Sequence, residues 1–150
     1  MPKWAFNHTS GAFTAEEKRQ LSQGMTRIYT TFGLPAFYCH THFFELPAEA
    51  VYTGGEIAPP STTISIYHAA HTFKSKEESE PFLKAFDDVI RPILKPKGIN
   101  WESAIYETSY DYWRIEGLIP PAMGSDQLKK WVAANKITNE EALLRKQGYL

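Results

Sequence analysis

The chain has 150 residues, of which 43% are hydrophobic and 14% aromatic, so it is long enough for one domain with a substantial core and is not generally disordered. Its net charge is −1 and its lysines and arginines are scattered, which argues against a nucleic-acid partner. The single cysteine, Cys39, excludes an intramolecular disulfide and a thiolate metal cluster, and no apolar run approaches the length of a membrane span.

The first 45 residues predict a strand, a helix and a second strand. Alternation of Trp4 and Phe6 with smaller or polar residues indicates a short strand over 3–7. Thr14 and Glu17 have the spacing of a capping box, which opens a helix that Gly33 and Pro35 end. The apolar residues at helical spacing are Leu21, Met25, Ile28 and Phe32. The aromatic-rich run 36–45 then predicts a long strand, with Phe37, Cys39, Thr41 and Phe43 on one face and Tyr38, His40, His42 and Phe44 on the other.

The next 62 residues repeat this pattern after a connecting loop. Three prolines and the pair Gly54-Gly55 predict the loop over 46–61. Residues 62–70 alternate and are β-branched, so they predict a third strand. Ser75 or Ser79 caps a second helix, which Pro92 bends or ends, and 101–107 form the fourth strand.

This order predicts an α+β fold made of tandem β-α-β repeats, one over about 2–45 and one over about 62–107. Parallel strands need a crossover helix, and two such units give a four-stranded mixed sheet with two helices on one face. The other face of the sheet is then left uncovered, so we expect an oligomer.

The last segment, 108–150, does not continue the repeat, although we expect it to belong to the same single domain of residues 1–150. Three aromatic residues with Arg114 and Glu116 in the run Tyr110-Asp-Tyr-Trp-Arg-Ile-Glu116 predict an aromatic arm that packs on a neighbouring subunit. Ser125 caps a short helix, and Thr138-Asn-Glu-Glu141 predicts a second capping box.

Pro2 is the first candidate for chemistry. If Met1 is removed, Pro2 becomes a secondary amine at the head of the first strand. An amine placed in an apolar cavity loses hydration, its pKa falls, and it becomes neutral near pH 7. Pro2 would then serve as a general base or as a nucleophile.

With these elements in place, the chain resembles the tautomerase superfamily, in the branch that includes cis-3-chloroacrylic acid dehalogenase and its fungal homologues. The resemblance spans residues 2 to about 132. It rests on Met1-Pro2-x-Trp4, Thr14-Ala15-x-x-Lys18, Met25-Thr26-x-x-Tyr29, Val51-Tyr52-x-Gly54-Gly55 and Trp113-Arg-Ile-Glu-Gly117 with Pro120-Pro121.

The resemblance implies a homotrimer, a catalytic amino-terminal proline and cationic side chains that hold a carboxylate substrate. Pro2 matches the family proline directly. At the family's other positions this chain has different residues: Tyr29 for a helix-terminal histidine, His71 and Lys74 near the two substrate-binding arginines, Ala104 for a tyrosine with Tyr106 nearby, and Ile115 or Glu116 for the water-activating glutamate.

From these residues we expect a tautomerase-like enzyme that acts on a small keto, enol or unsaturated carboxylic acid, with hydratase or dehalogenase chemistry as further options. Pro2, Tyr29 and Glu116 are the predicted catalytic residues. The predicted substrate-binding residues are His71, Lys74, Arg114 and Tyr106. The alternative is a trimer that has lost the chemistry and binds a small molecule or protein. We expect no cofactor, nucleic acid or membrane, and the polar start without a signal-peptide pattern predicts a cytoplasmic protein.

A metal site is the rival interpretation of the histidines. His40-Thr-His42 followed by Glu45 resembles the strand motif of cupins, and His68 and His71 would join it only if the strands pair in register. The interval from His42 to Glu45 is too short for that motif and the predicted helices do not fit a jelly roll, so no metal is predicted.

Overall fold

A computed structural model describes residues 2–69 and 71–150 and contains the expected four-stranded mixed sheet. Its strands are β1 (Lys3–Thr9), β2 (His40–Leu46), β5 (Ser61–His68) and β6 (Asn100–Glu107). Their order is β2-β1-β5-β6. β1 is parallel to β2 and antiparallel to β5, and β5 is parallel to β6, so two β-α-β units meet at the β1–β5 pair. The α+β prediction is confirmed.

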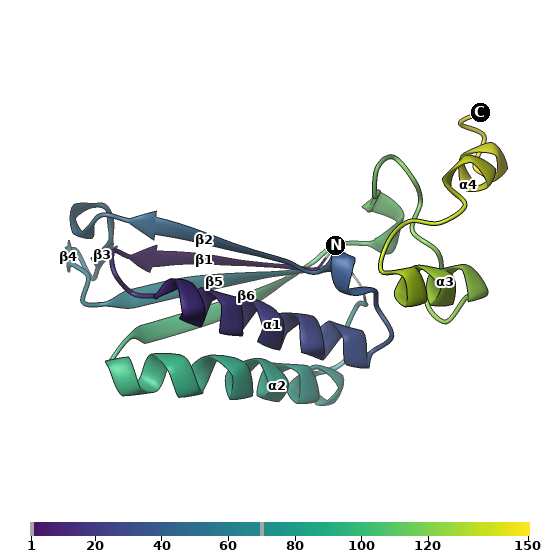
Figure 1. Ribbon diagram of the computed structural model, residues 1–150. Helices are drawn as coiled ribbons and strands as arrows, with labels where there is room; N and C mark the ends of the chain where they lie inside the picture. The colour runs from purple at the N-terminus through teal and green to yellow at the C-terminus, as the bar shows by residue number, and fades with distance from the viewer. Residues whose placement is uncertain (1, 70) are drawn as a thin grey trace.

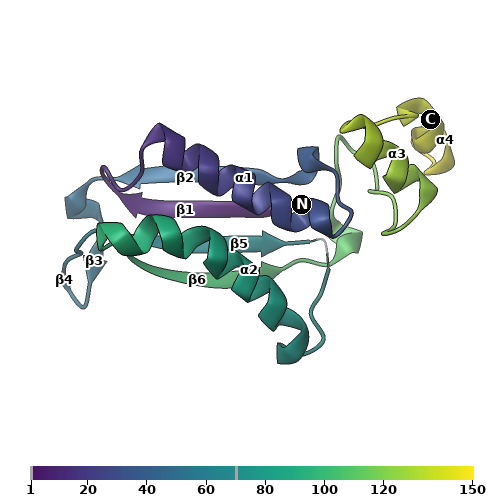
Figure 2. The ribbon, with the colours of Figure 1, turned by 60° about the horizontal axis from the view of Figure 1, so that its bottom comes forward.

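Both long helices, α1 (Ala15–Thr31) and α2 (Lys76–Leu94), lie on one face of the sheet (Figures 1 and 2). The capping box at α1 is confirmed: the Thr14 N–H donates to Glu17 Oε2 at 2.7 Å, and the Glu17 N–H donates to Thr14 Oγ1 at 3.2 Å. Ser75, not Ser79, caps α2. The helix continues through Pro92 to Leu94, so this proline does not end it.

The core lies between the helices and the sheet. It is built from alternate strand residues and from residues at helical spacing: Trp4, Phe6, Ile64 and Ile66 from the sheet, and Leu21, Met25, Ile28, Phe82, Phe86 and Ile90 from the helices. Phe32, predicted to belong to the apolar stripe of α1, is 60% exposed because it follows the last helical turn.

The two helices are in tight contact at Gly24 of α1, which faces Val89 of α2. A Cβ atom at this position would lie 2.5 Å from Cγ1 of Val89, which is closer than side chains can pack. We expect Gly24→Ala to destabilise the protein by about 1–2 kcal/mol, since overpacking outweighs the gain of about 1 kcal/mol in helix propensity. Urea unfolding measures the change. Gly24→Ala with Val89→Ala should recover much of the loss, and equal destabilisation in both variants would contradict the proposed clash.

The chain between the first helix and the second β-α-β unit differs from prediction in two places. Residues Ala36–Tyr38 form a 3-10 helix (η1) after Pro35 rather than the start of β2, so the predicted alternation of faces holds only from His40 on. The loop over 46–61 contains a short 3-10 helix, η2 (Ala48–Ala50), and a hairpin of β3 (Tyr52–Thr53) and β4 (Glu56–Ile57). Gly54 and Gly55 make its turn with φ of 63° and 92°, which favour glycine.

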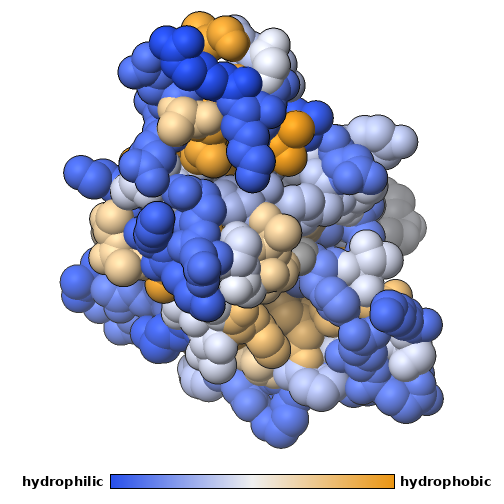
Figure 3. Space-filling view, turned by 90° about the vertical axis from the view of Figure 1, so that its right-hand side faces the viewer, coloured by the Kyte–Doolittle hydropathy of each residue, from blue (hydrophilic) through white to orange (hydrophobic). Residues whose placement is uncertain are grey.

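The carboxy-terminal segment packs at the end of the sheet where the chain begins (Figure 1), and Figure 3 looks onto this end. It contains the 3-10 helix η4 (Tyr110–Tyr112), α3 (Asp126–Ala134) and α4 (Glu140–Lys146). Ser125 caps α3 as predicted. The predicted capping box at Thr138 is wrong: Asn139 precedes α4 in a left-handed conformation without a side-chain cap.

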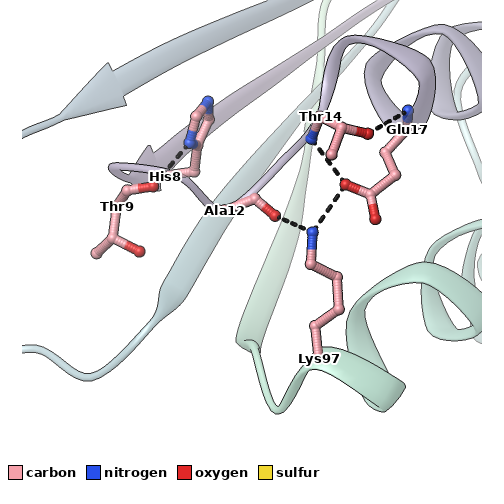
Figure 4. A network of polar contacts seen from close by, with 6 residues as sticks. All are labelled: His8, Thr9, Ala12, Thr14, Glu17 and Lys97. Atoms are coloured by element: carbon pink, nitrogen blue, oxygen red, sulfur yellow. Dashed lines mark hydrogen bonds and ion pairs between the residues drawn. The ribbon is translucent and has the colours of Figure 1, made fainter.

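At the other end of the sheet, Lys97 of the 3-10 helix η3 (Lys95–Lys97) joins the end of α2 to the start of α1 (Figure 4). Its ammonium donates to the Ala12 carbonyl and to Glu17 Oε2, both at 2.7 Å. The hydrogen bond from Lys97 is the main reason that the pKa of Glu17 lies below its usual 4.5.

We expect Lys97→Met to destabilise the fold by about 1 kcal/mol at pH 7. A lowered pKa means that the bridge contributes above the ordinary carboxylate pKa and is lost as Glu17 becomes protonated in the folded protein. The difference from wild type should therefore shrink below pH 4.5. Urea unfolding at several pH values measures it, with the exposed Lys95→Met on the same turn as control. A difference that persists in acid would contradict the ion pair.

Candidate active site

A cavity of about 470 Å³ opens where α1 ends, α2 begins and β5 reaches its last residue. It is mostly apolar with a few polar groups, as ligand sites in proteins usually are. It is lined by Tyr29, Phe32 and Leu34, by His68, His71 and Phe73, by Glu78, Pro81 and Phe82, and by Met123 of the carboxy-terminal segment. In Figure 3, this end of the molecule shows apolar atoms gathered in a recess between polar ridges.

Pro2 lies buried at the head of β1 and is not among the residues that line this cavity. Its carbonyl accepts the His40 N–H at 3.0 Å. Lys3 pairs with His40 on one side and with Tyr67 on the other, so one further step places Pro2 opposite Cys39 and His68. Residues directly opposite each other share a face of the sheet, and Pro2 therefore lies on the helix-covered face together with His68.

Tyr29 and His68 form a buried hydrogen-bonded pair at the inner end of the cavity. The Tyr29 hydroxyl lies 3.1 Å from His68 Nδ1, and the His68 ring stacks on Phe73 with 5.0 Å between centroids. Burial lowers the pKa of His68 to about 4 and raises the pKa of Tyr29 above its ordinary value. Both groups are therefore neutral at physiological pH.

His71 and Lys74 meet the carboxylate of Glu78 at the rim of the cavity. His71 Nε2 lies 2.7 Å from Glu78 Oε1, and the Lys74 backbone N–H donates to Oε2 at 2.7 Å. The bond from Lys74, followed by that from His71, holds the pKa of Glu78 below its usual range. His71 lines the cavity but faces a carboxylate of the chain itself, and Lys74 is not among the lining residues.

Arg114 and Glu116 line a second hollow of about 210 Å³, which also includes Tyr38 and His40. Arg114 Nη1 donates to the carbonyls of Asp111 and Trp113, both at 2.8 Å. Glu116 has a φ of 50° within the tight turn that pairs Ile115 with Leu118. His40, which lines the second hollow, donates its backbone N–H to the Pro2 carbonyl, and His68, which lines the first cavity, stands opposite Pro2. The two hollows therefore lie on either side of the head of β1.

Tyr106 is separated from both hollows. It is half exposed on the uncovered face of the sheet and stacks on Tyr67 with 5.4 Å between centroids. Lys3 Nζ lies 4.2 Å from the centre of the Tyr67 ring. Within one chain, Tyr106 therefore lies across the sheet from Tyr29 and His68.

His68 is a site residue that we did not predict from the sequence. The buried residues of β5 are Thr62, Ile64, Ile66 and His68. Strict alternation along the predicted strand places His68 on the same face as the two isoleucines, which is the signal that could have identified it. Its partner Tyr29 was predicted.

Cys39 lies opposite Pro2 on its other side. Burial raises the pKa of its thiol to about 12, so the sulfur stays protonated and is a poor nucleophile. The Cys39 thiol is therefore not expected to act as a base or nucleophile beside the Pro2 amine.

The strand register separates the histidines of the rival metal interpretation. His40 and His42 pair with Lys3 and Ala5 on the uncovered face, whereas His68 lies on the helix-covered face. Within residues 2–69 and 71–150, no three His, Cys, Asp or Glu side chains are grouped as a metal site. In the same residues, no helix is both long and apolar enough to cross a membrane.

Comparison with known proteins agrees with this fold. Residues 1–136 match the family described as "Putative oxalocrotonate tautomerase enzyme", and the chain belongs to this family. The fold and the family together define a tautomerase-type enzyme. No curated protein matches the chain.

Two solved structures are at least 33% identical to the chain, and a third, of lower identity, shares its fold. A "probable enzyme from the thermophilic fungus Aspergillus fumigatus" is 44% identical with a TM-score of 0.88, over 93% of this chain and 97% of that one. RhCC from Rhodococcus jostii RHA1 is 33% identical with a TM-score of 0.86, over 91% of this chain and 99% of its own. N1, a member of the cis-3-chloroacrylic acid dehalogenase family, is 18% identical with a TM-score of 0.68, over 99% of this chain and 100% of its own, and shares the fold.

Proposed function

We propose that the protein, after removal of Met1, uses the amine of Pro2 as base or nucleophile on a small keto, enol or unsaturated carboxylic acid. The observation that carries this proposal is the location of Pro2. It is buried at the head of β1 and stands opposite His68, which lines the cavity of about 470 Å³. An amine in such surroundings loses hydration and becomes neutral and reactive near pH 7.

The polar groups around the cavities suggest how the substrate is oriented. Arg114, His71 and Lys74 are the candidates for binding the carboxylate, and Tyr29 and Glu116 are the candidates for protonation or water activation. A substrate carboxylate at the rim of the large cavity would have to replace Glu78 as the partner of His71. This competition favours Arg114, whose contacts are to backbone carbonyls, as the stronger clamp.

A homotrimer gives Tyr106 a role in the site. The uncovered sheet face exposes Phe44, Tyr67 and Tyr106, which are 48%, 37% and 51% accessible in the single chain. Burial of these side chains favours association. Two structures with the same fold, at 21% and 14% identity, are described as fused 4-OT trimers. In such an assembly, Tyr106 of one copy would reach the site of another.

A binding protein without catalysis is the second candidate, and Glu78 is the observation that favours it. Its carboxylate already occupies the ring nitrogen of His71 at the mouth of a mostly apolar cavity, so an uncharged ligand would fit there without displacing Glu78. Under this alternative the fold is kept and Pro2 has no chemical role.

Two mass measurements test the proposal. The intact protein should lack Met1, since retained Met1 turns the Pro2 nitrogen into a tertiary amide without basicity. Incubation with a 2-oxo acid and borohydride should then attach the acid to the peptide that begins at Pro2. Retained Met1 would exclude the mechanism altogether, whereas free Pro2 that is never trapped would leave it as a base and exclude imine formation.

A further inference from the structure

The unpartnered ring nitrogen of His68 carries an inference about ligand binding. His68 is 4% exposed and lines the large cavity. Its Nδ1 meets Tyr29, but its Nε2 is buried and has no hydrogen-bond partner among the described residues. A buried polar atom left unpaired costs free energy, so such an atom in a cavity indicates a missing partner.

The neighbours of Tyr29 determine which nitrogen of His68 carries the proton. The Trp4 indole N–H can only donate a hydrogen bond. It is buried and has no hydrogen-bond partner within residues 2–69 and 71–150. Burial raises the pKa of the Tyr29 hydroxyl, and the nearby Trp4 N–H partly opposes this effect. Because the Trp4 N–H cannot accept a hydrogen bond, the Tyr29 hydroxyl donates its proton to His68 Nδ1, which lies 3.1 Å away. His68 then carries its own proton on Nε2.

Building on the function proposed above, we propose that His68 Nε2–H donates a hydrogen bond to the carbonyl or enol oxygen of a small 2-oxo acid, and that Tyr29 is a positioning residue that fixes the His68 tautomer. No proton leaves the imidazole in this role. The neutral ring is a donor aimed at the oxygen on which negative charge develops when Pro2 removes a proton from the adjacent carbon.

The strand register supports this arrangement. His68, which lines the cavity, and Pro2 are opposite each other on the same face of the sheet, so the donor and the amine are neighbours at the head of β1. The stacking of His68 on Phe73, at 13° between ring planes, holds the imidazole in this orientation. A substrate oxygen and its neighbouring carbon can therefore be held by one residue and deprotonated by the other.

Histidine-selective ¹⁵N NMR tests the tautomer and the contact without any turnover. The wild-type spectrum should show His68 as neutral and protonated at Nε2, and phenylpyruvate should shift this Nε2–H signal. Tyr29→Phe should weaken the preference for this tautomer. A proton found on Nδ1 in the free protein, or a His68 signal that saturating phenylpyruvate does not move, would overturn the inference.

Binding constants give a second, independent measurement. His68→Leu should raise the Kd of phenylpyruvate about tenfold, as expected for one lost hydrogen bond, and His68→Gln, which keeps an N–H donor, should raise it less. Thr62→Val is the matched control, because Thr62 lies on the same face of β5 and bonds to the Asn7 carbonyl away from the cavity. Its Kd should be unchanged.

The outcomes separate this inference from the proposed function. Phenylpyruvate that shifts His68 while wild type and Pro2→Ala turn over equally slowly would support the contact and reject the catalytic role of Pro2. No detectable binding of phenylpyruvate, or equal Kd values for His68→Leu and wild type with both proteins folded by circular dichroism, would overturn the contact.

Discussion

Replacement of Pro2 by alanine is expected to lower kcat/KM for phenylenolpyruvate or 2-hydroxymuconate by about 10²-fold or more, the usual contribution of a positioned acid or base. Alanine leaves a primary amine at the head of β1 with less basicity and more freedom than the ring nitrogen of proline. Steady-state tautomerisation followed by absorbance measures the loss.

A serine inserted between Met1 and Pro2 should remove activity more completely, because Pro2 then becomes an internal amide. Pro47→Ala, an exposed proline that precedes η2, controls for the loss of a proline elsewhere and should retain wild-type kinetics. Equal kcat/KM for Pro2→Ala and wild type would reject the catalytic role of the amine and favour the binding protein.

Trp131→Ala is expected to cost about 3–5 kcal/mol of unfolding free energy, the usual range for a buried tryptophan. Trp131 is fully buried, packs near Phe37 and Tyr38 of η1, and donates its indole N–H to the Thr138 carbonyl at 3.1 Å. It therefore joins α3 to η1 and to the start of α4. Urea unfolding measures the change.

The neighbouring Val132 provides a matched control on the same helix. It is 39% exposed, so Val132→Ala should cost less than about 1 kcal/mol. A separate early transition in Trp131→Ala would show that the carboxy-terminal segment unfolds by itself. A cost no larger than that of Val132→Ala would contradict the anchoring role of the indole.

The sheet and its two helices were predictable because their signals are local. Alternation around Trp4 and Phe6, the capping box at Thr14 and helical spacing from Leu21 to Ile28 each depend on neighbours within one element. The two units of strand, helix and strand then restrict the topology to few choices. These features were confirmed in the structure.

The errors occur where distant residues decide the local structure. Phe37 and Tyr38 alternate as well as a strand would, but Tyr38 packs against Trp113 and Trp131, and η1 forms instead. Thr138 looks like a helix cap, but its carbonyl and hydroxyl accept hydrogen bonds from Gln127. Neither partner can be recognised from the local sequence.

The candidate site divides in the same way. Pro2, Tyr29 and His71 could be selected from the sequence because their residue types and positions indicated chemistry. The role of His68 requires the register of β1 with β5, and the capture of His71 by Glu78 requires the geometry of the first turn of α2. Both are relations between elements rather than properties of a motif.

The rate at which the protonated thiol of Cys39 is alkylated can be used to measure local opening of the strand that carries Pro2. While the fold is closed, a thiol with a pKa of about 12 reacts slowly with alkylating reagents. Cys39 is only partly buried, and local opening would expose its sulfur fully to water and restore its ordinary reactivity. As the chain has one cysteine, its labelling rate reports how often the edge between β2 and the head of β1 opens. Slower labelling in the presence of a ligand would show that occupation of the cavity suppresses this breathing.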